Sequence, residues 1–190
     1  MFLLSLLDGE PLLDAMPVIK TTHYPWAEDY FKPLAYARLA VVKNKGVFCD
    51  IQAFEKNPEI TGADILDNSC VAVSCDFAPG SGQVLTVVLD AADSCRMYIN
   101  GEAVDTSIKL SSHKSQDELG WYWNVRFYIP HTEIKNWFSV SNIQNGHKMK
   151  GNIYKFQRAG SVSHMGAAAP MTDMSIFSAD NLADFTVVSY

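Results

Sequence analysis

The residues of this chain that could carry out chemistry do not stand at the spacings that catalysis requires. The sequence has no H-E-x-x-H or H-x-H pair for a zinc ion, no G-x-S-x-G turn for a nucleophilic serine, and no serine or cysteine with an evident base. A glycosidase needs two carboxylates set about 5–10 Å apart across a cleft, and no motif points to such a pair. We therefore expect no catalytic residue, no metal centre and no enzymatic activity. The five histidines are His23, His113, His131, His147 and His164.

Two pairs of aspartates could instead hold a calcium ion, Asp64 with Asp67 and Asp90 with Asp93. Some β-sandwich modules use calcium structurally, but neither pair matches the D-x-[DN]-x-[DN]-G loop. Aspartates in loops more often form turns, because their carboxylates accept hydrogen bonds from nearby backbone N–H groups. We therefore expect no cofactor.

The four cysteines indicate a reducing compartment. Their separations match neither a C-x-x-C redox motif nor paired zinc knuckles, so we expect free thiols buried in strands. The apolar opening Met1–Leu7 has no basic residue before it and is interrupted at once by Asp8-Gly9-Glu10, unlike a signal peptide. No segment approaches the ~20 apolar residues of a membrane span. These features predict a cytoplasmic protein with no membrane partner. The cysteines are Cys49, Cys70, Cys75 and Cys95.

Length and composition indicate one globular domain over residues 1–190. Hydrophobic residues make up 48% of the 190 residues and charged residues 19%, which excludes a disordered chain. The net charge of -6 argues against nucleic acid as a partner, because nucleic-acid binders usually carry a basic surface. No internal repeat or linker divides the chain, although residues 1–30 show weak periodicity and form a less regular segment.

Beyond about residue 35, short apolar stretches alternate with turn residues, as in a sandwich or barrel. Residues 36–42 and 47–54 flank turn chemistry at Lys43-Asn44-Lys45-Gly46 and predict a hairpin, and Asn100-Gly101 predicts a second one. Past Pro130 we expect one or two helical turns over residues 132–138, with Thr132 as N-cap. The further strands expected are residues 70–77, 84–90, 96–99, 102–106, 121–129, 150–157 and 184–190.

The clearest strand, residues 121–129, alternates between two faces. The first face, which we expect to be core, carries Trp121, Trp123, Val125, Phe127 and Ile129. The second face can meet solvent or a ligand and carries Tyr122, Asn124, Arg126 and Tyr128. Trp26, in the irregular N-terminal segment, can equally plug one sheet or contact a ligand.

Three C-terminal segments follow the order of a known closing pattern. They are Gly151-Asn152-Ile153-Tyr154-Lys155-Phe156, His164-Met165-Gly166-Ala167-Ala168-Ala169-Pro170 and Phe177-Ser178-Ala179-Asp180-Asn181-Leu182-Ala183-Asp184-Phe185. These resemble the end of carbohydrate-binding family 9-like modules, where a G-N-F-Y-K/R strand precedes an H-F-G-S-W-S-P-like loop and an F-H-x-P-E-x-F-G segment.

Four earlier pieces resemble the same family in the same order. Residues 36–55 with Lys56-Asn57-Pro58 are similar to its first hairpin, which closes with E-x-x-P; the others are residues 68–73, 84–90 and 123–130. The resemblance covers roughly residues 30–190. It implies an all-β fold, an antiparallel β-sandwich of jelly-roll type.

The departures from the family pattern concern its ligand site. In the family, two tryptophans sandwich a pyranose ring while carboxylates, basic groups and amides hold its hydroxyls. Leu66 and Ala168 stand where the resemblance expects the tryptophans, and Asn68, Ala72 and Val88 stand where it expects acidic residues. The resemblance therefore implies a degenerate site at these positions.

We accordingly expect a non-catalytic binding module whose ligand, by the resemblance, is a mono- or oligosaccharide. A surviving ligand site would fall to the polar strand face and the C-terminal loop, at Arg126, Asn124, Tyr128 and His164. The alternative is a β-sandwich that has lost sugar binding and acts through contacts with a protein partner of unknown identity. A pocket lined by aromatic and polar groups would favour the first reading, and a large flat apolar patch the second.

Overall fold

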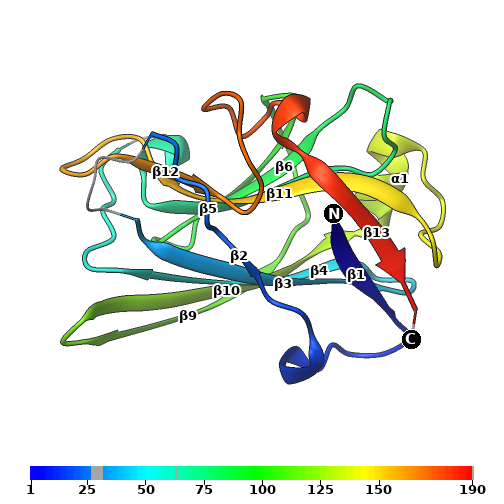
Figure 1. The fold of residues 1–190 in the computed structure, drawn as a ribbon, viewed down its shortest axis with the longest axis horizontal. Coiled ribbons are helices and arrows are strands. Elements are labelled where there is room, and N and C mark those ends of the chain that lie inside the picture. Colours follow the sequence, from blue (N-terminus) through cyan, green and yellow to red (C-terminus); the bar gives the residue numbers. More distant parts are fainter. Residues whose placement is uncertain (27–31, 63, 190) are drawn as a thin grey trace.

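The computed structural model describes residues 1–26, 32–62 and 64–189, and the regular secondary structure of these residues is almost entirely β-strand (Figure 1). The single α-helix among these residues is α1 (His131–Phe138), and short 3-10 turns occur at Leu13–Ala15, Ile65–Asp67 and Ala179–Asn181. None of the helices in the described part of the chain is long and apolar enough to cross a membrane. The strands are β1 (Phe2–Leu7), β2 (Ile19–Lys20), β3 (Leu34–Val42), β4 (Gly46–Glu55), β5 (Cys70–Asp76), β6 (Leu85–Asp90), β7 (Cys95–Ile99), β8 (Glu102–Val104), β9 (Leu110–Asp117), β10 (Gly120–Pro130), β11 (Lys148–Gln157), β12 (His164–Ala167) and β13 (Ala183–Val188).

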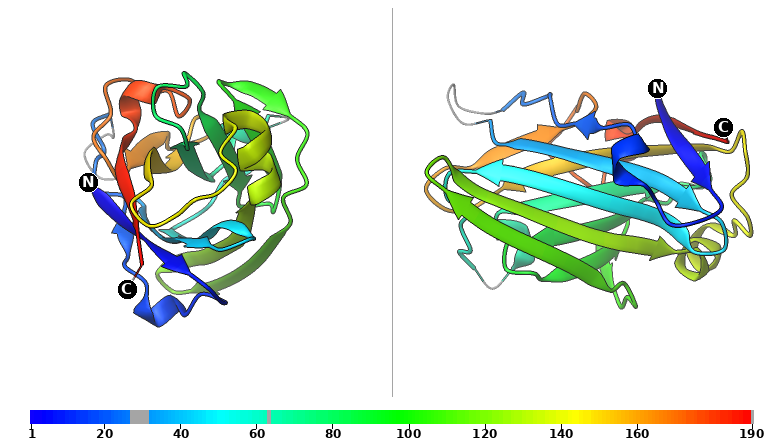
Figure 2. Two further views of the ribbon diagram at one scale, coloured as in Figure 1. Left: turned by 90° about the vertical axis from the view of Figure 1, so that its right-hand side faces the viewer. Right: turned by 90° about the horizontal axis from the view of Figure 1, so that it is seen from below.

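The strands form one hydrogen-bonded sheet that curls into two facing layers (Figure 2). Strand order is β8-β7-β6-β5-β11-β13-β1-β3-β4-β10-β9, with β12 added beside β11 and β2 beside β3. The upper layer of Figure 1 consists of β8, β7, β6, β5, β11 and β13, and the lower layer consists of β3, β4, β10 and β9. This arrangement confirms the predicted all-β sandwich of jelly-roll type.

Strand β1 joins the two layers and departs from the antiparallel pattern. It pairs in parallel with β13 on one side and with β3 on the other. Residues 1–30 show weak periodicity, so β1 was not predicted from its own sequence. Its pairing partners lie far away along the chain, so no neighbouring segment pointed to it either. Residues 27–30 of that segment lie outside the described residues, as does Tyr190 at the end of the predicted last strand.

The core lies between the layers and follows from the period-2 alternation of the strands. Every second side chain of β3, β4 and β10 points inward and meets the inward side chains of β5, β6 and β11. Burying each large apolar side chain stabilises the fold by roughly 1.5–3 kcal/mol. The central inward residues are Ala37, Leu39, Cys49, Ile51, Val125 and Phe127 from the lower layer, and Val71, Val73, Val87, Leu89 and Ile153 from the upper one.

Helix α1 closes one end of the sandwich. Its buried residues Ile134 and Phe138 lie one turn apart, and the Phe138 ring meets Phe77 edge-on with centroids 5.2 Å apart. The predicted helical turns are therefore confirmed, but the prediction that Thr132 is the N-cap is wrong. Pro130 occupies the N-cap position, and no side chain caps this end.

Strand β9 was not predicted from the sequence. Its residues are polar on both faces, and apart from Leu110 and Lys114 they are exposed. It pairs with β10 at the edge of the lower layer, and its Lys114 forms an ion pair with Asp93. An edge strand whose side chains are mostly exposed shows no hydrophobic alternation in its sequence.

The two tryptophans of β10 have different environments. Trp123 is 2% exposed and lies in the core, as predicted. The prediction that Trp121 also lies in the core is wrong. Its side chain is half-buried and lines an open hollow with Asn57, Pro58 and Ile60. It is the second residue of β10, at the end of the sandwich, where a loop takes the place of the facing layer.

We predict that Trp123→Ala lowers the free energy of unfolding by about 3–5 kcal/mol, the usual loss for a large buried aromatic. Trp121→Ala, the matched control two residues away, should lose clearly less because its ring keeps contact with solvent. Urea unfolding followed by circular dichroism measures both. Equal losses for the two variants would contradict the assignment.

All four cysteines are free, and burial keeps their thiols protonated. Burial raises the pKa of Cys75 to about 12 and that of the half-buried Cys95 to about 11, and it raises the pKa of Cys49 and Cys70 further. Thiolate is the reactive form, so native protein should react slowly with a thiol reagent.

We predict that at pH 8 the native protein reacts slowly and first at Cys95, and that all four thiols react in denaturant without reductant. Cys95→Ser should remove the first phase. Recovery of fewer than four thiols from unoxidised protein would mean a disulfide and would contradict the structure.

Candidate functional site

The outer face of the lower layer, the side of β3, β4, β10 and β9 that points away from the core, carries three cross-strand rows of side chains. Register sets residues of the four strands directly opposite one another, so each row holds one residue from each strand. Neighbouring rows lie two residues, or about 7 Å, apart along β10. The ring row is Leu34, Phe54, Tyr122 and Ser115; the amide row is Tyr36, Gln52, Asn124 and His113; the charged row is Arg38, Asp50, Arg126 and Ser111.

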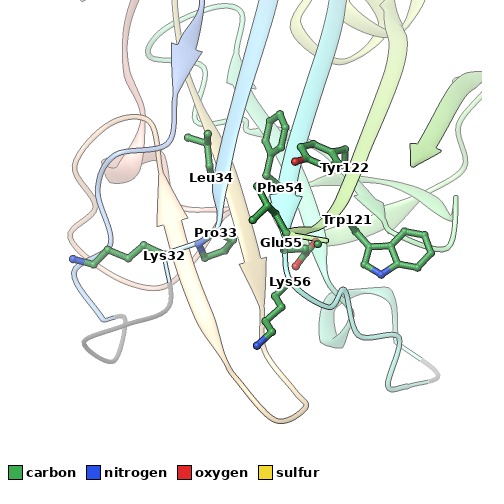
Figure 3. Close-up of a pocket in the computed structure, with 10 residues that line it drawn as sticks. Lys32, Pro33, Leu34, Phe54, Glu55, Lys56, Trp121 and Tyr122 are labelled. Atoms are coloured by element: carbon green, nitrogen blue, oxygen red, sulfur yellow. The ribbon is translucent and has the colours of Figure 1, made fainter. Parts of the chain in front are cut away.

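The ring row offers an aromatic surface. Phe54 lies between Leu34 and Tyr122 (Figure 3), with the Tyr122 ring edge-on at 4.8 Å between centroids. Tyr36 of the next row stacks on Phe54 at 5.7 Å. An open hollow of about 360 Å³ lies over this row and reaches Trp121 at the end of β10. Flat, half-exposed rings in an open hollow suit a ligand with an apolar face.

The charged row is organised by Asp50, whose side chain is fully buried. Its Oδ1 accepts hydrogen bonds from Nε and Nη2 of Arg126, at 3.1 and 3.0 Å, and from Nδ2 of Asn124 at 3.0 Å. Its Oδ2 lies 3.7 Å from Nη1 of Arg38. One carboxylate therefore holds two guanidinium groups and an amide in fixed positions, which preorganises their remaining donors.

A second hollow of about 520 Å³ lies over Gln52, Asn124 and His113 of the amide row and over Arg126 and Ser111 of the charged row. It shares Phe54 and Tyr122 with the first hollow, so the two hollows adjoin along β10, and we call them together the groove. From Gly120 to Arg126 this groove spans about 20 Å of strand. Its polar lining residues are Gln52, Ser111, Ser112, His113, Ser115, Asn124 and Arg126.

The groove brings together two of the four residues proposed from sequence, Asn124 and Arg126. Tyr128 lies one row beyond them, where its ring contacts Phe48 and its hydroxyl donates to Glu10. Burial, helped by Glu10, raises the pKa of Tyr128 to about 12. Tyr128 shares the face of Arg126 but lies outside the groove.

His164 lies elsewhere, buried on β12 in the upper layer. Its Nε2 is 3.1 Å from Nζ of Lys155. Burial and the adjacent ammonium lower the pKa of His164 to about 3, so the imidazole is neutral at ordinary pH. The structure therefore separates His164 from the other three proposed residues.

Lys155 is the centre of a buried polar cluster between the layers. Its Nζ lies 3.1 Å from Oε2 of Glu55 on β4 and donates to Oγ of Ser69 at 2.9 Å. The other carboxylate oxygen of Glu55 accepts hydrogen bonds from Trp123 Nε1 at 2.6 Å and from Ser69 Oγ at 2.5 Å. Burial lowers the pKa of Lys155, and Glu55 opposes that shift. Because Glu55 is engaged inside the sandwich, it is not a free carboxylate of the groove that it borders.

The positions that the resemblance assigns to the family's ligand site are closed in this chain. Ala72 and Val88 are fully buried on the outer side of the upper layer, in an apolar cluster with Tyr154, Phe156 and Ile176. The backbone oxygen of Ile176 accepts a hydrogen bond from Ser74 Oγ at 2.6 Å, which ties the covering C-terminal loop to β5. Leu66 packs against the same cluster, whereas Ala168 belongs to the central core.

Three of the four loop aspartates considered for calcium have a local structural role for their side chains. Asp64 accepts from the backbone of Leu66, Asp90 from the backbones of Ala92 and Ser94, and Asp93 pairs with Lys114 at 2.9 Å. In the described residues no group of three or more histidines, cysteines or acidic residues is arranged to hold a metal ion.

Sequence reasoning missed the contributions of β3, β4 and β9 to the groove. The signal in β4 was present, because Asp50, Gln52 and Phe54 alternate with Cys49, Ile51 and Ala53. What the sequence did not reveal is that β4 lies beside β10, in the register that makes the rows.

The chain matches no family model and no curated protein sequence. Among solved structures it is similar to a candidate carbohydrate-binding protein from Bacteroides uniformis, with a TM-score of 0.73 and 15% identity over 98% of this chain and 99% of that one. It is also similar to a carbohydrate-binding module of family 9 from Caldicellulosiruptor kristjanssonii, solved with cellotriose and with glucose. These two structures give a TM-score of 0.72 at 8% identity, over 99% of this chain and 94% and 96% of theirs. The shared fold is the one expected from the resemblance.

We predict that Lys155→Met lowers the free energy of unfolding by about 3–5 kcal/mol, because it leaves the Glu55 carboxylate buried without its cation. The double variant Glu55→Gln with Lys155→Met should recover most of that loss. Lys43→Met, which removes an exposed lysine paired with Asp8, is the control and should change little. Urea unfolding checks all three, and a double variant no more stable than Lys155→Met would contradict the buried pair.

Proposed function

We propose that this protein is a non-catalytic carbohydrate-binding module, folded as one unit over residues 1–190, whose ligand is a mono- or oligosaccharide. The observation that carries the proposal is the groove on the lower layer, where an aromatic row adjoins amide and charged rows. Support comes from the fold, which is shared over nearly the whole chain with modules solved with cellotriose and glucose.

The three rows match the two kinds of contact that sugars make. The apolar face of a pyranose ring can stack on Phe54 or Tyr122, and its hydroxyls can bond with Gln52, Asn124 and Arg126. Tyr128 is proposed as a support for this face. His164 lies in the opposite layer, so we assign it to the buried cluster.

The carboxylates near the groove support a binding role over a hydrolytic one. Asp50 is buried and held by Arg126, and Glu55 is held inside the sandwich by Lys155. Hydrolysis of a glycoside needs an acid and a second carboxylate facing each other across the substrate. Neither of these two groups is available for that role.

We predict that cellotriose and xylotriose bind with millimolar dissociation constants, equivalent to roughly 4 kcal/mol. Two half-exposed rings and neutral hydrogen bonds give only a modest surplus over the cost of ordering a flexible sugar. Tyr122→Ala should weaken binding about tenfold or more through loss of the stacking surface. Calorimetric titration or nuclear magnetic resonance shift mapping measures the effect, and circular dichroism checks the fold.

The control is Trp26→Ala, which removes a half-exposed ring lying with His164 and Met174 at a separate hollow. It should leave binding unchanged. Loss of binding in Trp26→Ala but not in Tyr122→Ala would place the site at that hollow and contradict the groove. An absence of binding to any carbohydrate would contradict the proposed function.

A further inference from the structure

The outer face of the lower layer is cationic although the chain as a whole is acidic. The chain has a net charge of -6. Within the rows, however, Arg38 and Arg126 share the single carboxylate of Asp50. Lys20 of β2 is exposed and extends the amide row, since it lies opposite Tyr36. Three cations therefore face one carboxylate.

Further lysines border the aromatic end of the groove. Lys32 and Lys56 both line the first hollow and extend outward from the ring row (Figure 3). Two further carboxylates lie near the ends of the face: Asp117 accepts a hydrogen bond from the Tyr122 hydroxyl and stays ionised, and Glu10 pairs with Lys45. The cations of the face, Arg38, Arg126, Lys20, Lys32 and Lys56, therefore outnumber the unpaired carboxylates, and the excess of positive charge is clearest around Arg126.

The two guanidinium groups keep unused donors. A guanidinium has five N–H donors in a planar fork. Arg126 directs Nε and Nη2 at the same oxygen of Asp50, and its side chain is 46% exposed, so Nη1 remains free for a ligand. Arg38 meets Asp50 through Nη1 at 3.7 Å, but its side chain is mostly buried and its Nε is inaccessible, so the exposed fork is that of Arg126. A planar fork of this kind pairs with an anionic oxygen group in a bidentate manner.

We propose, building on the proposed carbohydrate-binding function, that the groove selects glycans carrying an anionic group, either the carboxylate of a uronic acid or a sulfate ester. The anionic group lies at Arg126, and a sugar ring of the same oligosaccharide stacks on Tyr122 and Phe54. Tyr122 and Arg126 are four residues apart on β10, about 13 Å, which is farther than one pyranose ring reaches. The ligand is therefore an oligosaccharide.

The test is calorimetric titration of the full chain with three trisaccharides of matched length: trigalacturonate, neutral galactotriose and a sulfated galactotriose. We expect an anionic trisaccharide to bind at least tenfold more tightly than the neutral one, and to lose that advantage as salt is raised. Whichever of the two anionic sugars binds better identifies the source of the charge. Equal affinity for the charged and neutral sugars would overturn the inference and leave the proposed function intact. No binding of any of the three, nor of cellotriose, would remove both.

Matched variants localise the effect. Arg126→Gln should reduce the ratio of the affinities for the anionic and the neutral trisaccharide to near one. The control is Arg158→Gln, which makes the same change of net charge at an exposed arginine on the upper layer and should leave that ratio unchanged. Lys20→Gln disturbs no partner of Asp50 and should lower the preference severalfold even if Arg126→Gln folds poorly. Equal effects of Arg126→Gln and Arg158→Gln would mean that only net charge matters, and would overturn the inference.

Discussion

The pairing register of β4 with its two neighbours is the constraint on which both the core and the groove depend. β4 lies between β3 and β10 and pairs with each over nine or more residues. Because side chains alternate with period two, a slip of one residue would turn Ile51 outward and bury Gln52. The same register that fills the core therefore aligns the three outer rows, so the proposed ligand face needs no loops to position it.

The buried cluster around Lys155 fixes the two layers relative to each other. Glu55 comes from the lower layer and Lys155 from the upper one, while Trp123 and Ser69 complete the contacts of the carboxylate. Removing two charges from water is costly, so such a pair contributes little net stability compared with an apolar filling. Its contribution is geometrical, because it links Glu55 at the end of β4 to Lys155 on β11 across the core. That arrangement holds the end of β4 in place, beside the ring row.

Alternation within a single strand was enough to predict part of this structure. The strand at residues 121–129 was found, with Asn124 and Arg126 on its open face, because local periodicity reports which side chains share a face. Alternation failed to predict β9, whose side chains are mostly exposed. It also failed at Trp121, which points to the same side of β10 as the core residues but lies beyond the end of the core. The rows could not be predicted, because they depend on pairing between strands some 70 residues apart, which local sequence does not encode. His164 was misplaced for a related reason: its partner Lys155 lies across a β11–β12 pairing that no single-strand pattern shows.

The two layers of the sandwich differ in what their outer faces carry. On the upper layer, Ala72 and Val88 pack under Ile176, and an apolar cluster of this kind has no room for a sugar ring. On the lower layer, Asp50 holds the side chains of Arg38 and Arg126 in a fixed network. A slot between two rings discriminates by shape and by the apolar faces of a sugar, so it tolerates salt. A row of guanidinium groups discriminates by charge, and its contribution declines with ionic strength. The proposed groove therefore differs from the family's slot in the property of the ligand that it selects, which is charge in place of ring shape.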